Sequence, residues 1–303
     1  MSSSRTGTGR LAPTPSGELH LGNILAFGAA WLDARSRGDR LLLRVEDLDP
    51  VRSKAELAQQ HREELQWLGI TWDEEVAPQS SRTYAHVLSA LEEQTYRCTC
   101  SRKTLQTMGG RYDGRCRGAK QPTGALRWRL PKTPVALSDL VQPEAVVDVT
   151  NTFGDPVLVR KDDVSSYLLA IVADDAADGV TRVVRGADLY THTALQHALR
   201  DALALPHPAT AHTPMVVGPD LKKLGKSHGS SSIRAWRDAG YTAEDVWRFV
   251  LPMLGLAPQA TLLDALPNFS WDHVPAGTLK VHEDRVGPCE WSWLTPRGQF
   301  GSS

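Results

Sequence analysis

The sequence RLAPTPSGELHLGN, residues 10–23, runs from the end of a predicted strand into the start of a predicted helix, and it decides the fold. A Pro- and Gly-rich turn at this point leaves backbone N–H groups free, and the dipole of the following helix favours an anion. His20 can donate a hydrogen bond to a phosphate oxygen, and Gly22 lets a ribose or a flat group approach the backbone. A tight turn with Ser16 as the helix cap is the alternative interpretation.

Strand and helix patterns alternate outward from this segment. The predicted helix from about residue 20 is followed by LLLRVE, residues 41–46, an apolar run typical of a buried strand. Strands that alternate with helices form βαβ units, so the pattern predicts a fold of the α/β class with a parallel sheet. The further predicted helices are 53–68, 81–94, 165–173, 191–204, 231–239 and 243–254, and the further predicted strands are 157–160, 180–184 and 215–217.

The composition bounds the class of protein. The chain has 303 residues, of which 41% are apolar and 23% charged, as in ordinary globular proteins. No apolar run approaches the roughly 18 residues of a membrane span, and the first residues, MSSSRTGTG, lack the apolar core of a secretion signal. Four cysteines are too few for a disulfide framework in a chain of this length. We therefore expect a cytoplasmic protein that does not bind membranes.

The region between residues 97 and 151 interrupts the alternation and is basic. Between Arg97 and Lys132 there are ten Lys or Arg residues and one acidic residue, Asp113, which gives this window a charge of +9. The whole chain has a formal charge of −1, so the remaining residues carry −10. Such an uneven distribution of charge allows one face of the protein to bind a polyanion. The region is therefore predicted to be an insertion that binds the RNA backbone. A solvated surface is the alternative.

Three of the four cysteines lie in this insertion. Cys98, Cys100 and Cys116 fall within nineteen residues, a spacing that suits a tetrahedral Zn²⁺ ion. No histidine lies inside the cluster, so the residues alone leave the fourth ligand open between water and an outside group. Because Asp113 is the only titratable acid or base beside the site, the zinc is expected to be structural. Reduced cysteines without a metal are the alternative, and Cys289 is expected to have no role.

A second glycine-containing segment, KKLGKSHGS at residues 222–230, carries three lysines. A basic, flexible loop can fold over a triphosphate and neutralise the charge that develops during nucleotidyl transfer. On its own, such a loop is more often solvated surface. Together with residues 10–23 in one α/β chain, it predicts a nucleotide site.

These segments, with RVEDLD at 44–49 and RGADL at 185–189, resemble the class I glutamyl-tRNA synthetases over roughly residues 8 to 255. Residues 20–23 stand at the place of the family's "HIGH" element and residues 223–227 at that of "KMSKS". One departure is Gly225, where the family usually has serine, so no catalytic role is expected there. The resemblance implies a Rossmann-type nucleotide-binding core with a zinc-stapled α/β insertion and a C-terminal helical segment.

The resemblance also implies residue roles. Arg10 and Arg185 would bind the carboxylates of glutamate, and each contact would contribute roughly 1.5–3 kcal/mol. Glu46 would bind the ammonium group, and Tyr167 would form part of the pocket wall. Surface ion pairing is the alternative for Arg10 and Glu46, and core packing is the alternative for Tyr167. The implied glutamate site comprises Arg10, Leu11, Ala12, Pro13, Thr14, Glu46, Tyr167 and Arg185. The implied ATP site, with Mg²⁺ on the nucleotide, comprises His20, Gly22, Asn23 and Lys226. Catalytic roles fall on His20, Lys226 and the accessory Lys223, and the family supplies Tyr112 as the fourth zinc ligand beside Cys98, Cys100 and Cys116.

The expected organisation is a catalytic core in two parts, 1–96 and 152–218, around the insertion 97–151, followed by the "KMSKS"-like loop, a helical stem-contact region and a tail at 219–303. This tail is expected to be too short for an anticodon-binding domain. That favours a truncated branch of the family, whose members form glutamyl-adenylate without tRNA and attach glutamate to queuosine at the wobble position of tRNA(Asp). A monomer is expected. The alternatives are a short synthetase that charges a tRNA 3′ end, an adenylate-forming ligase with a peptide or small-molecule acceptor, a nucleotidyltransferase with a similar turn, and a non-catalytic RNA-binding protein.

Overall fold

A parallel sheet formed by the first strands organises the N-terminal part of the computed structural model, which describes residues 7–224, 232–283 and 285–294. The strand β1 pairs with β2 and β2 pairs with β3, all parallel. The first helix ends where Gly38 adopts the left-handed conformation (φ 67°), which glycine accepts at least cost. The elements are β1 (Thr8–Leu11), α1 (Leu21–Arg37), β2 (Arg40–Leu43), α2 (Ala55–Trp67) and β3 (Glu74–Glu75).

A second parallel pair, β9 and β10, lies beside β1. The backbone N–H of Thr181 donates to the carbonyl of Thr8 at 2.9 Å, where the two sheets meet. The strands therefore lie in the order β3, β2, β1, β9 and β10, which confirms the predicted α/β class with a Rossmann-type core. The elements of this part are α6 (Tyr167–Ala177), β9 (Arg182–Gly186), α7 (His192–Ala202) and β10 (Ala209–Thr213).

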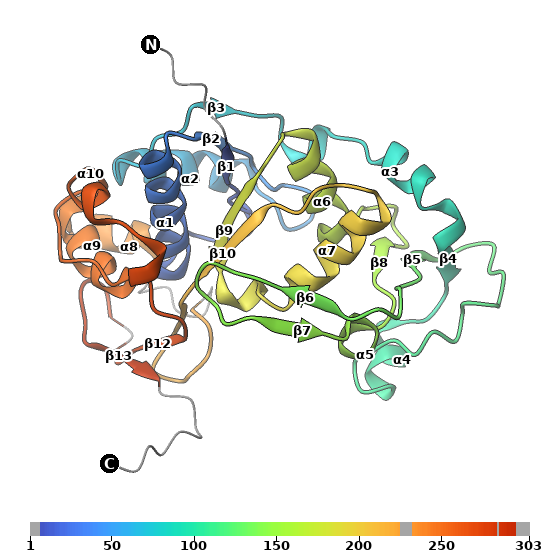
Figure 1. Cartoon of the computed structure of the whole chain (residues 1–303). Helices are drawn as coiled ribbons and strands as arrows, with labels where there is room; N and C mark the ends of the chain where they lie inside the picture. The colour runs from blue at the N-terminus through green and yellow to red at the C-terminus, as the bar shows by residue number, and fades with distance from the viewer. Residues whose placement is uncertain (1–6, 225–231, 284, 295–303) are drawn as a thin grey trace.

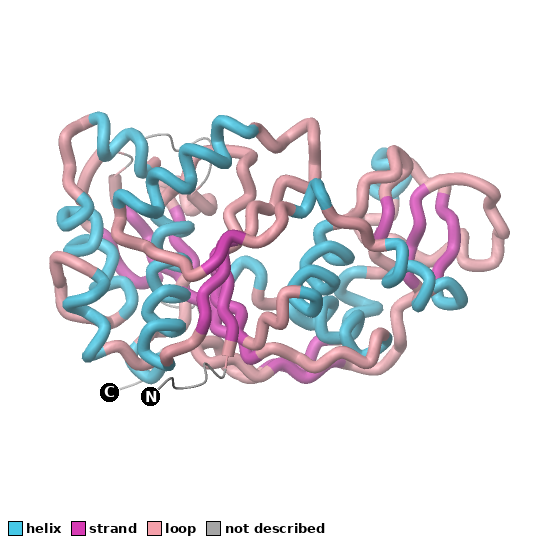
Figure 2. Tube along the Cα trace, turned by 90° about the horizontal axis from the view of Figure 1, so that it is seen from above, coloured by secondary structure: helices cyan, strands magenta, loops and turns pink. Residues whose placement is uncertain are grey.

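An antiparallel sheet of β4, β5 and β8 lies at the end of the molecule opposite the C-terminal helices (Figures 1 and 2). The strand β8 follows the predicted boundary at residue 152 but pairs with β5, so this sheet takes strands from both sides of that boundary. The division of the chain at this point stays a prediction. The elements are α3 (Ala85–Ala90), β4 (Thr95–Cys98), α4 (Arg102–Thr107), β5 (Ala125–Trp128), β6 (Val135–Leu137), β7 (Ala145–Val147), α5 (Val149–Phe153) and β8 (Val157–Val159).

The C-terminal part of the described chain adds a small mixed sheet and three short helices. The strand β11 pairs parallel with β12, which pairs antiparallel with β13. The sequence indicates no role for the tail after residue 267, and the structure shows that this tail supplies the last two strands. The elements are β11 (Met215–Val217), α8 (Ile233–Asp238), α9 (Ala243–Val250), α10 (Leu262–Ala265), β12 (Thr278–Val281) and β13 (Trp291–Leu294).

Two predicted helices are shorter than expected. The helix predicted over 81–94 is reduced to α3 and a 3₁₀ turn, Glu92–Gln94. The helix predicted over 243–254 gives way to a 3₁₀ turn at Leu251–Leu254, where Pro252 removes a backbone donor. None of the described helices is long and apolar enough to cross a membrane.

The central helix α1 is held by buried contacts from distant parts of the chain. A Cβ atom on Gly28 would lie 2.8 Å from the ring of Trp247, so this close approach of α1 to α9 requires glycine. Further along, the buried carboxylate of Asp33 accepts from Arg182 Nε at 2.9 Å and from Trp271 Nε1 at 2.7 Å. Asp33 thus ties β9 and the tail to the same helix.

We predict that Asp33→Ala lowers the free energy of unfolding by about 3 kcal/mol, because the substitution leaves the half-buried guanidinium of Arg182 without its buried partner. Trp271→Phe removes one hydrogen bond and should cost about 1 kcal/mol. Urea titrations followed by circular dichroism measure both values. Asp238→Ala is the control, since its surface pair with Arg234 is solvated. Unfolding midpoints for Asp33→Ala and Asp238→Ala that coincide would contradict the anchoring role of Asp33.

Candidate active site

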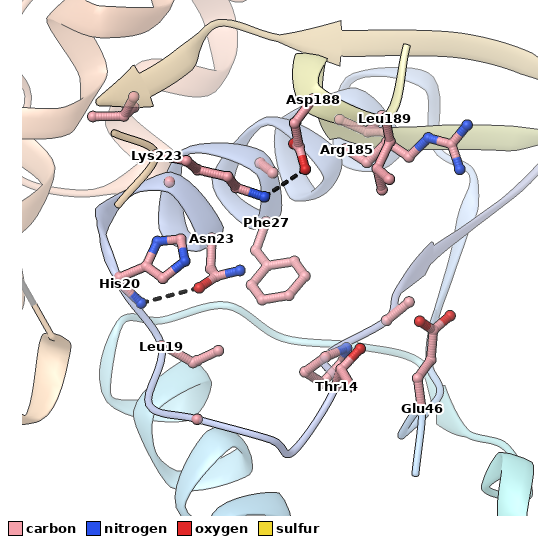
Figure 3. A pocket seen from close by; sticks show the side chains of 18 of the residues that line it. Thr14, Leu19, His20, Asn23, Phe27, Glu46, Arg185, Asp188, Leu189 and Lys223 are labelled. Atoms are coloured by element: carbon pink, nitrogen blue, oxygen red, sulfur yellow. Dashed lines mark hydrogen bonds and ion pairs between the residues drawn. The ribbon is translucent and has the colours of Figure 1, made fainter. Parts of the chain in front are cut away.

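A cavity of about 350 Å³ opens where β1 and β9 end and α1 begins, and Figure 3 shows its lining. Segments far apart in the sequence meet here, including the turn before α1, the start of α6 and the start of β11. Leu11 is the one predicted site residue of the described chain, apart from the metal cluster, that does not line it, because its side chain is fully buried in the core. The predicted residues that line the cavity are Arg10, Ala12, Pro13, Thr14, His20, Gly22, Asn23, Glu46, Tyr167, Arg185 and Lys223.

Arg10 and Glu46 lie at the floor of this cavity, and both are buried, with 4% and 5% of their surface exposed. The alternative interpretation of both as surface ion pairs is therefore wrong. Arg10 donates from Nη1 to the carbonyl of Val184 at 3.3 Å, and its Nε lies 3.3 Å from Asp175 Oδ1. Burial raises the pKa of Glu46, while the positive charges of Arg44 and Arg10 oppose that rise. An ammonium group placed in the cavity would favour the ionised carboxylate of Glu46.

Arg44 joins these groups into one buried ion cluster. Its side chain is fully buried, and its Nη2 contacts Asp175 Oδ1 at 2.6 Å and Glu46 Oε1 at 3.5 Å. Its Nη1 contacts Asp178 Oδ2 at 2.8 Å. Burial alone would lower the pKa of Arg44, but the facing carboxylates of Asp175 and Glu46 raise it above its usual value. The cluster fixes Arg10 and Glu46 in place at the ends of β1 and β2.

Arg185 lines the same cavity from β9, and the groups that accept its hydrogen bonds are uncharged. Its Nε donates to His212 Nε2 at 3.0 Å and its Nη2 donates to Thr193 Oγ1 at 2.8 Å. Its Nη1 is buried and has no hydrogen-bond partner within the described part of the chain. Burial lowers the pKa of Arg185, which still remains protonated at neutral pH. One guanidinium nitrogen is therefore left for an acceptor from outside the protein.

Tyr167 stands at the first position of α6 and lines the same cavity. Ser166 caps this helix, since its hydroxyl accepts from the backbone of Leu169 at 3.3 Å. Tyr167 is 39% exposed as a whole residue, so the alternative interpretation as core packing is wrong. The position suits contact with a ligand.

The start of α1 points into the cavity with the residues predicted for nucleotide binding. His20 is the N-terminal cap residue of α1, so the alternative with Ser16 in that role is wrong. The Oδ1 of Asn23 accepts from the backbone N–H of His20 at 3.1 Å (Figure 3). A Cβ atom on Gly22 would lie 3.2 Å from the imidazole ring of His20, so a larger residue at this position would crowd the ring. A 17-residue helix presents its positive end here, which suits a phosphate group.

Lys223 extends over the cavity from the segment after β11. It forms an ion pair with Asp188, which follows β9 in the predicted RGADL segment (Figure 3). The backbone N–H of Leu224 donates to Val216 at 3.2 Å, and after the undescribed residues the N–H of Ile233 donates to Leu19 at 2.9 Å. Leu224 is thus attached to β11, and Ile233 is attached to the turn that precedes α1. The predicted residues Lys226 and Gly225 lie outside the described residues.

The three insertion cysteines form a cluster that could hold a metal ion. The sulfur atoms of Cys98, Cys100 and Cys116 all lie within 4.8 Å of one another. The hydroxyl of Tyr112 accepts from the backbone N–H of Cys116 at 2.8 Å, and the side chain is buried. Burial and hydrogen bonding to the Cys116 side chain raise the pKa of Tyr112. Three thiols, with the hydroxyl oxygen of Tyr112 nearby as a fourth donor atom, suit a tetrahedral zinc site.

Several residues that line the cavity or support its lining residues were not predicted as site residues. Arg44 stands in a predicted strand and Asp175 just after a predicted helix, yet their pairing spans 131 residues. Asp188 is part of the RGADL segment. His212 and the Asp139 that contacts it had no sequence signal, since neither stands in a recognisable motif.

The chain is similar to known proteins along most of its length. The family described as class I tRNA synthetases (E and Q), catalytic domain, matches residues 8–262. A protein of Ectopseudomonas mendocina (strain ymp) named glutamyl-Q tRNA(Asp) synthetase is 40% identical over 286 residues, which cover 92% of this chain and 96% of that protein. A protein of the same name from Pseudomonas aeruginosa PAO1 is 41% identical over 263 residues, covering 85% of this chain and 88% of that protein.

Solved structures share the fold. A glutamate tRNA ligase of Elizabethkingia meningosepticum, in complex with its amino acid, superposes with a TM-score of 0.79 at 24% identity, covering 91% of this chain and 67% of that one. The glutamate-tRNA synthetase of Elizabethkingia anophelis gives a TM-score of 0.78 at 23% identity, with 95% and 68% covered. The parallel core, the cavity beside the start of α1 and the family match over 8–262 agree, and the chain belongs to the class I tRNA synthetases of the E and Q group.

Proposed function

We propose that this enzyme activates L-glutamate with ATP in the absence of tRNA and transfers the glutamyl group to queuosine at the wobble position of tRNA(Asp). The observation that carries the proposal is the 40% identity to a glutamyl-Q tRNA(Asp) synthetase along nearly the full length of both chains. A cavity with two buried arginines and a buried glutamate supports it, because those charges complement an amino acid with two carboxylates.

In this proposal, Arg10 and Arg185, on the neighbouring strands β1 and β9, bind the carboxylates of glutamate, and Glu46 binds its ammonium group. The orphaned Nη1 of Arg185 supports this role, since a buried donor without an acceptor is costly and a carboxylate oxygen would satisfy it. Tyr167 packs against the ligand. The backbone and side chains of residues 11–14, with Leu11 anchoring the segment in the core, shape the remaining wall.

ATP would lie over the start of α1, with phosphate oxygens near His20, Gly22 and Asn23. Magnesium accompanies the nucleotide and shields its charge. An α-carboxylate oxygen of glutamate then bonds to the α-phosphorus, the bond from that phosphorus to the bridging oxygen breaks, and pyrophosphate leaves. Lys226 and the accessory Lys223 neutralise the charge that builds on the phosphates. Attack of the acceptor on the glutamyl carbonyl releases AMP.

For Lys223 to reach the phosphates, its ion pair with Asp188 must open. Both partners are partly exposed, at 53% and 27%, so the pair is screened by water and costs little to exchange. The contact holds the lysine near the cavity before ATP binds.

We also propose that Cys98, Cys100 and Cys116 bind one structural zinc ion, with the hydroxyl of Tyr112 as the fourth ligand. The mutual proximity of the sulfur atoms supports the site. Gly154 supports the position of Tyr112, because a Cβ atom there would lie 2.2 Å from the Tyr112 carbonyl and its φ is +66°. The zinc would connect β4 to the loop at residue 116 and keep the basic insertion folded.

The insertion at 97–151 is proposed to bind the tRNA backbone, with the catalytic core in 1–96 and 152–218 and the stem-contact helices in 219–303. The side chains of Lys120 and Lys132 are exposed. Arg117, by contrast, donates twice to the buried Asp155 at 2.7 Å, so part of the charge in this window serves the fold. We propose that the enzyme acts in the cytoplasm as a monomer.

The function is tested by two assays on one preparation. We expect ATP–pyrophosphate exchange with L-glutamate alone, followed by glutamyl transfer to tRNA(Asp) that carries queuosine and none to tRNA(Asp) with unmodified guanosine. Mass analysis of the tRNA nucleosides identifies the modified base. His20→Ala should depress exchange by about one to three orders of magnitude, because the substitution removes one interaction with the transition state.

Equal charging of both tRNAs, or charging of tRNA(Glu) at its 3′ end, would reject this function in favour of a short glutamyl-tRNA synthetase. Exchange that requires tRNA would point the same way. Exchange rates that stay unchanged in His20→Ala would reject the role of that residue.

Zinc is tested by metal analysis of purified variants. We expect about one zinc per chain in the parent protein, on the basis of one four-ligand site, and loss of the metal in Cys98→Ser and Cys116→Ser. Tyr112→Phe should retain zinc but release it to a chelator faster, since one ligand is missing. Cys289→Ser is the matched control and should keep its zinc. A parent protein prepared with zinc in the medium that carries none would disprove the site.

The RNA surface is tested by charge reversal at exposed lysines. Lys120→Glu combined with Lys132→Glu should weaken tRNA binding and make the slope of log K against log salt shallower by about 1 for each phosphate that is no longer neutralised. Pyrophosphate exchange without tRNA should not change. Lys54→Glu, an exposed lysine outside the insertion, is the control. An effect of Lys54→Glu on tRNA affinity as large as that of the double variant would argue against a dedicated surface.

A further inference from the structure

A buried hydrogen-bonded chain runs from the insertion to the wall of the cavity through Asp139, His212 and Arg185. Asp139 Oδ2 lies 2.6 Å from His212 Nδ1, and Arg185 Nε lies 3.0 Å from His212 Nε2. The side chains of Asp139 and His212 have no exposed surface. Asp139 belongs to the loop after β6, whereas His212 is on β10 and Arg185 is on β9.

The partners determine which nitrogen of His212 carries the proton. An arginine can only donate, so Nε2 of His212 must accept from Arg185, and the proton of a neutral ring is then on Nδ1, where it donates to Asp139. Burial lowers the pKa of His212, so the ring is neutral at neutral pH. Burial would raise the pKa of Asp139, but the hydrogen bond from His212 and a backbone N–H outweigh it and hold that pKa at about 2.

Asp139 itself is fixed from several directions. Its Oδ1 accepts from the backbone N–H groups of Val141 and Gln142 at 3.0 Å and from that of His212 at 3.1 Å. The side chain of Gln142 in turn donates to the carbonyl of His212 at 2.9 Å. The imidazole ring therefore has one orientation and one tautomer.

The chain holds Arg185 without neutralising it. The groups that accept its hydrogen bonds, the ring of His212 and the hydroxyl of Thr193, are uncharged, as is the neighbouring Tyr167. The carboxylate of Asp139 lies one residue further away, and that of Asp175 acts on Arg185 only through its charge. Arg44 in the same region is treated differently, since carboxylates contact both of its terminal nitrogens. The charge of Arg185 therefore remains available to a carboxylate in the cavity, at the Nη1 that has no protein partner among the described residues.

We propose that Asp139 and His212 are positioning residues that set the affinity for glutamate by orienting Arg185 through an uncharged acceptor. This inference rests on the proposed role of Arg185 in binding a carboxylate. Asp139 acts through the tautomer of His212, and Thr193 completes the pair of neutral acceptors. Neither Asp139 nor His212 would contact ATP, because neither lines the cavity.

The test is calorimetric titration of L-glutamate, and separately of ATP, into the parent protein and variants. His212→Phe keeps an aromatic ring but has no acceptor, and Thr193→Val keeps the shape but has no hydroxyl. Each should raise the Kd for glutamate about tenfold or more, as expected for one missing hydrogen bond to a charged group, with the Kd for ATP within about twofold. Asp139→Asn should weaken glutamate binding as well, because an amide can also stabilise the wrong tautomer.

Conservative variants and a distant control separate positioning from general stability. His212→Gln and Thr193→Ser restore an acceptor and should bind glutamate more tightly than His212→Phe and Thr193→Val. Asp33→Asn, a buried carboxylate away from the cavity, should lower the unfolding midpoint and leave the Kd for glutamate unchanged.

The inference is overturned if folded His212→Phe and Thr193→Val bind glutamate as the parent does, if the Kd values for glutamate and ATP rise together, or if the parent protein binds no glutamate. The proposed function fails separately: glutamate would bind with the expected dependence on these residues, yet no glutamyl group would reach queuosine in tRNA(Asp).

Discussion

The burial of Arg44 is the constraint on which the cavity depends. A guanidinium without exposed surface is stable only if carboxylates surround it, and Asp175, Asp178 and Glu46 do so. Asp175 is shared with Arg10, so the two strands β1 and β2 and the helix α6 meet through these charges. Removing one member would leave an uncompensated buried charge, whereas the intact cluster leaves Glu46 and Arg10 rigid at the edge of the sheet. The electrostatics of the cavity follow from that arrangement.

The sequence predicts the core elements well where apolar runs are long, as in α1, β2 and α6. It misses β10, because residues 209–213 read as ATAHT and have no apolar pattern, although all but the first residue of the strand are buried. The pairing of β8 with β5 is also not readable, since antiparallel and parallel partners produce the same local pattern in a three-residue strand. Strand partners depend on contacts far apart in the chain.

In the candidate site, too, some residues could be predicted from local sequence and others could not. Arg10, Glu46, Tyr167 and Arg185 could be named because they stand in motifs that resemble a family, and the structure brings them to one cavity. The groups that support them could not be named. Asp139 and His212 are 73 residues apart, and a lone histidine in a strand carries no local signal of a buried partner. Likewise, the net charge of residues 97–132 does not indicate that Arg117 and Arg127 form hydrogen bonds within the protein, to Asp155.

The buried contact of Asp139 with His212 has a thermodynamic consequence. It connects the basic insertion to Arg185 in the cavity wall without a flexible joint, since backbone and side-chain hydrogen bonds fix both residues. A partner that binds the insertion and displaces Asp139 would change the orientation of Arg185, and with it the affinity of the cavity for an anionic ligand. By linkage, that ligand would then change the affinity for the partner by the same factor and in the same direction. Under that condition, binding at the insertion and binding in the cavity would be reciprocally coupled.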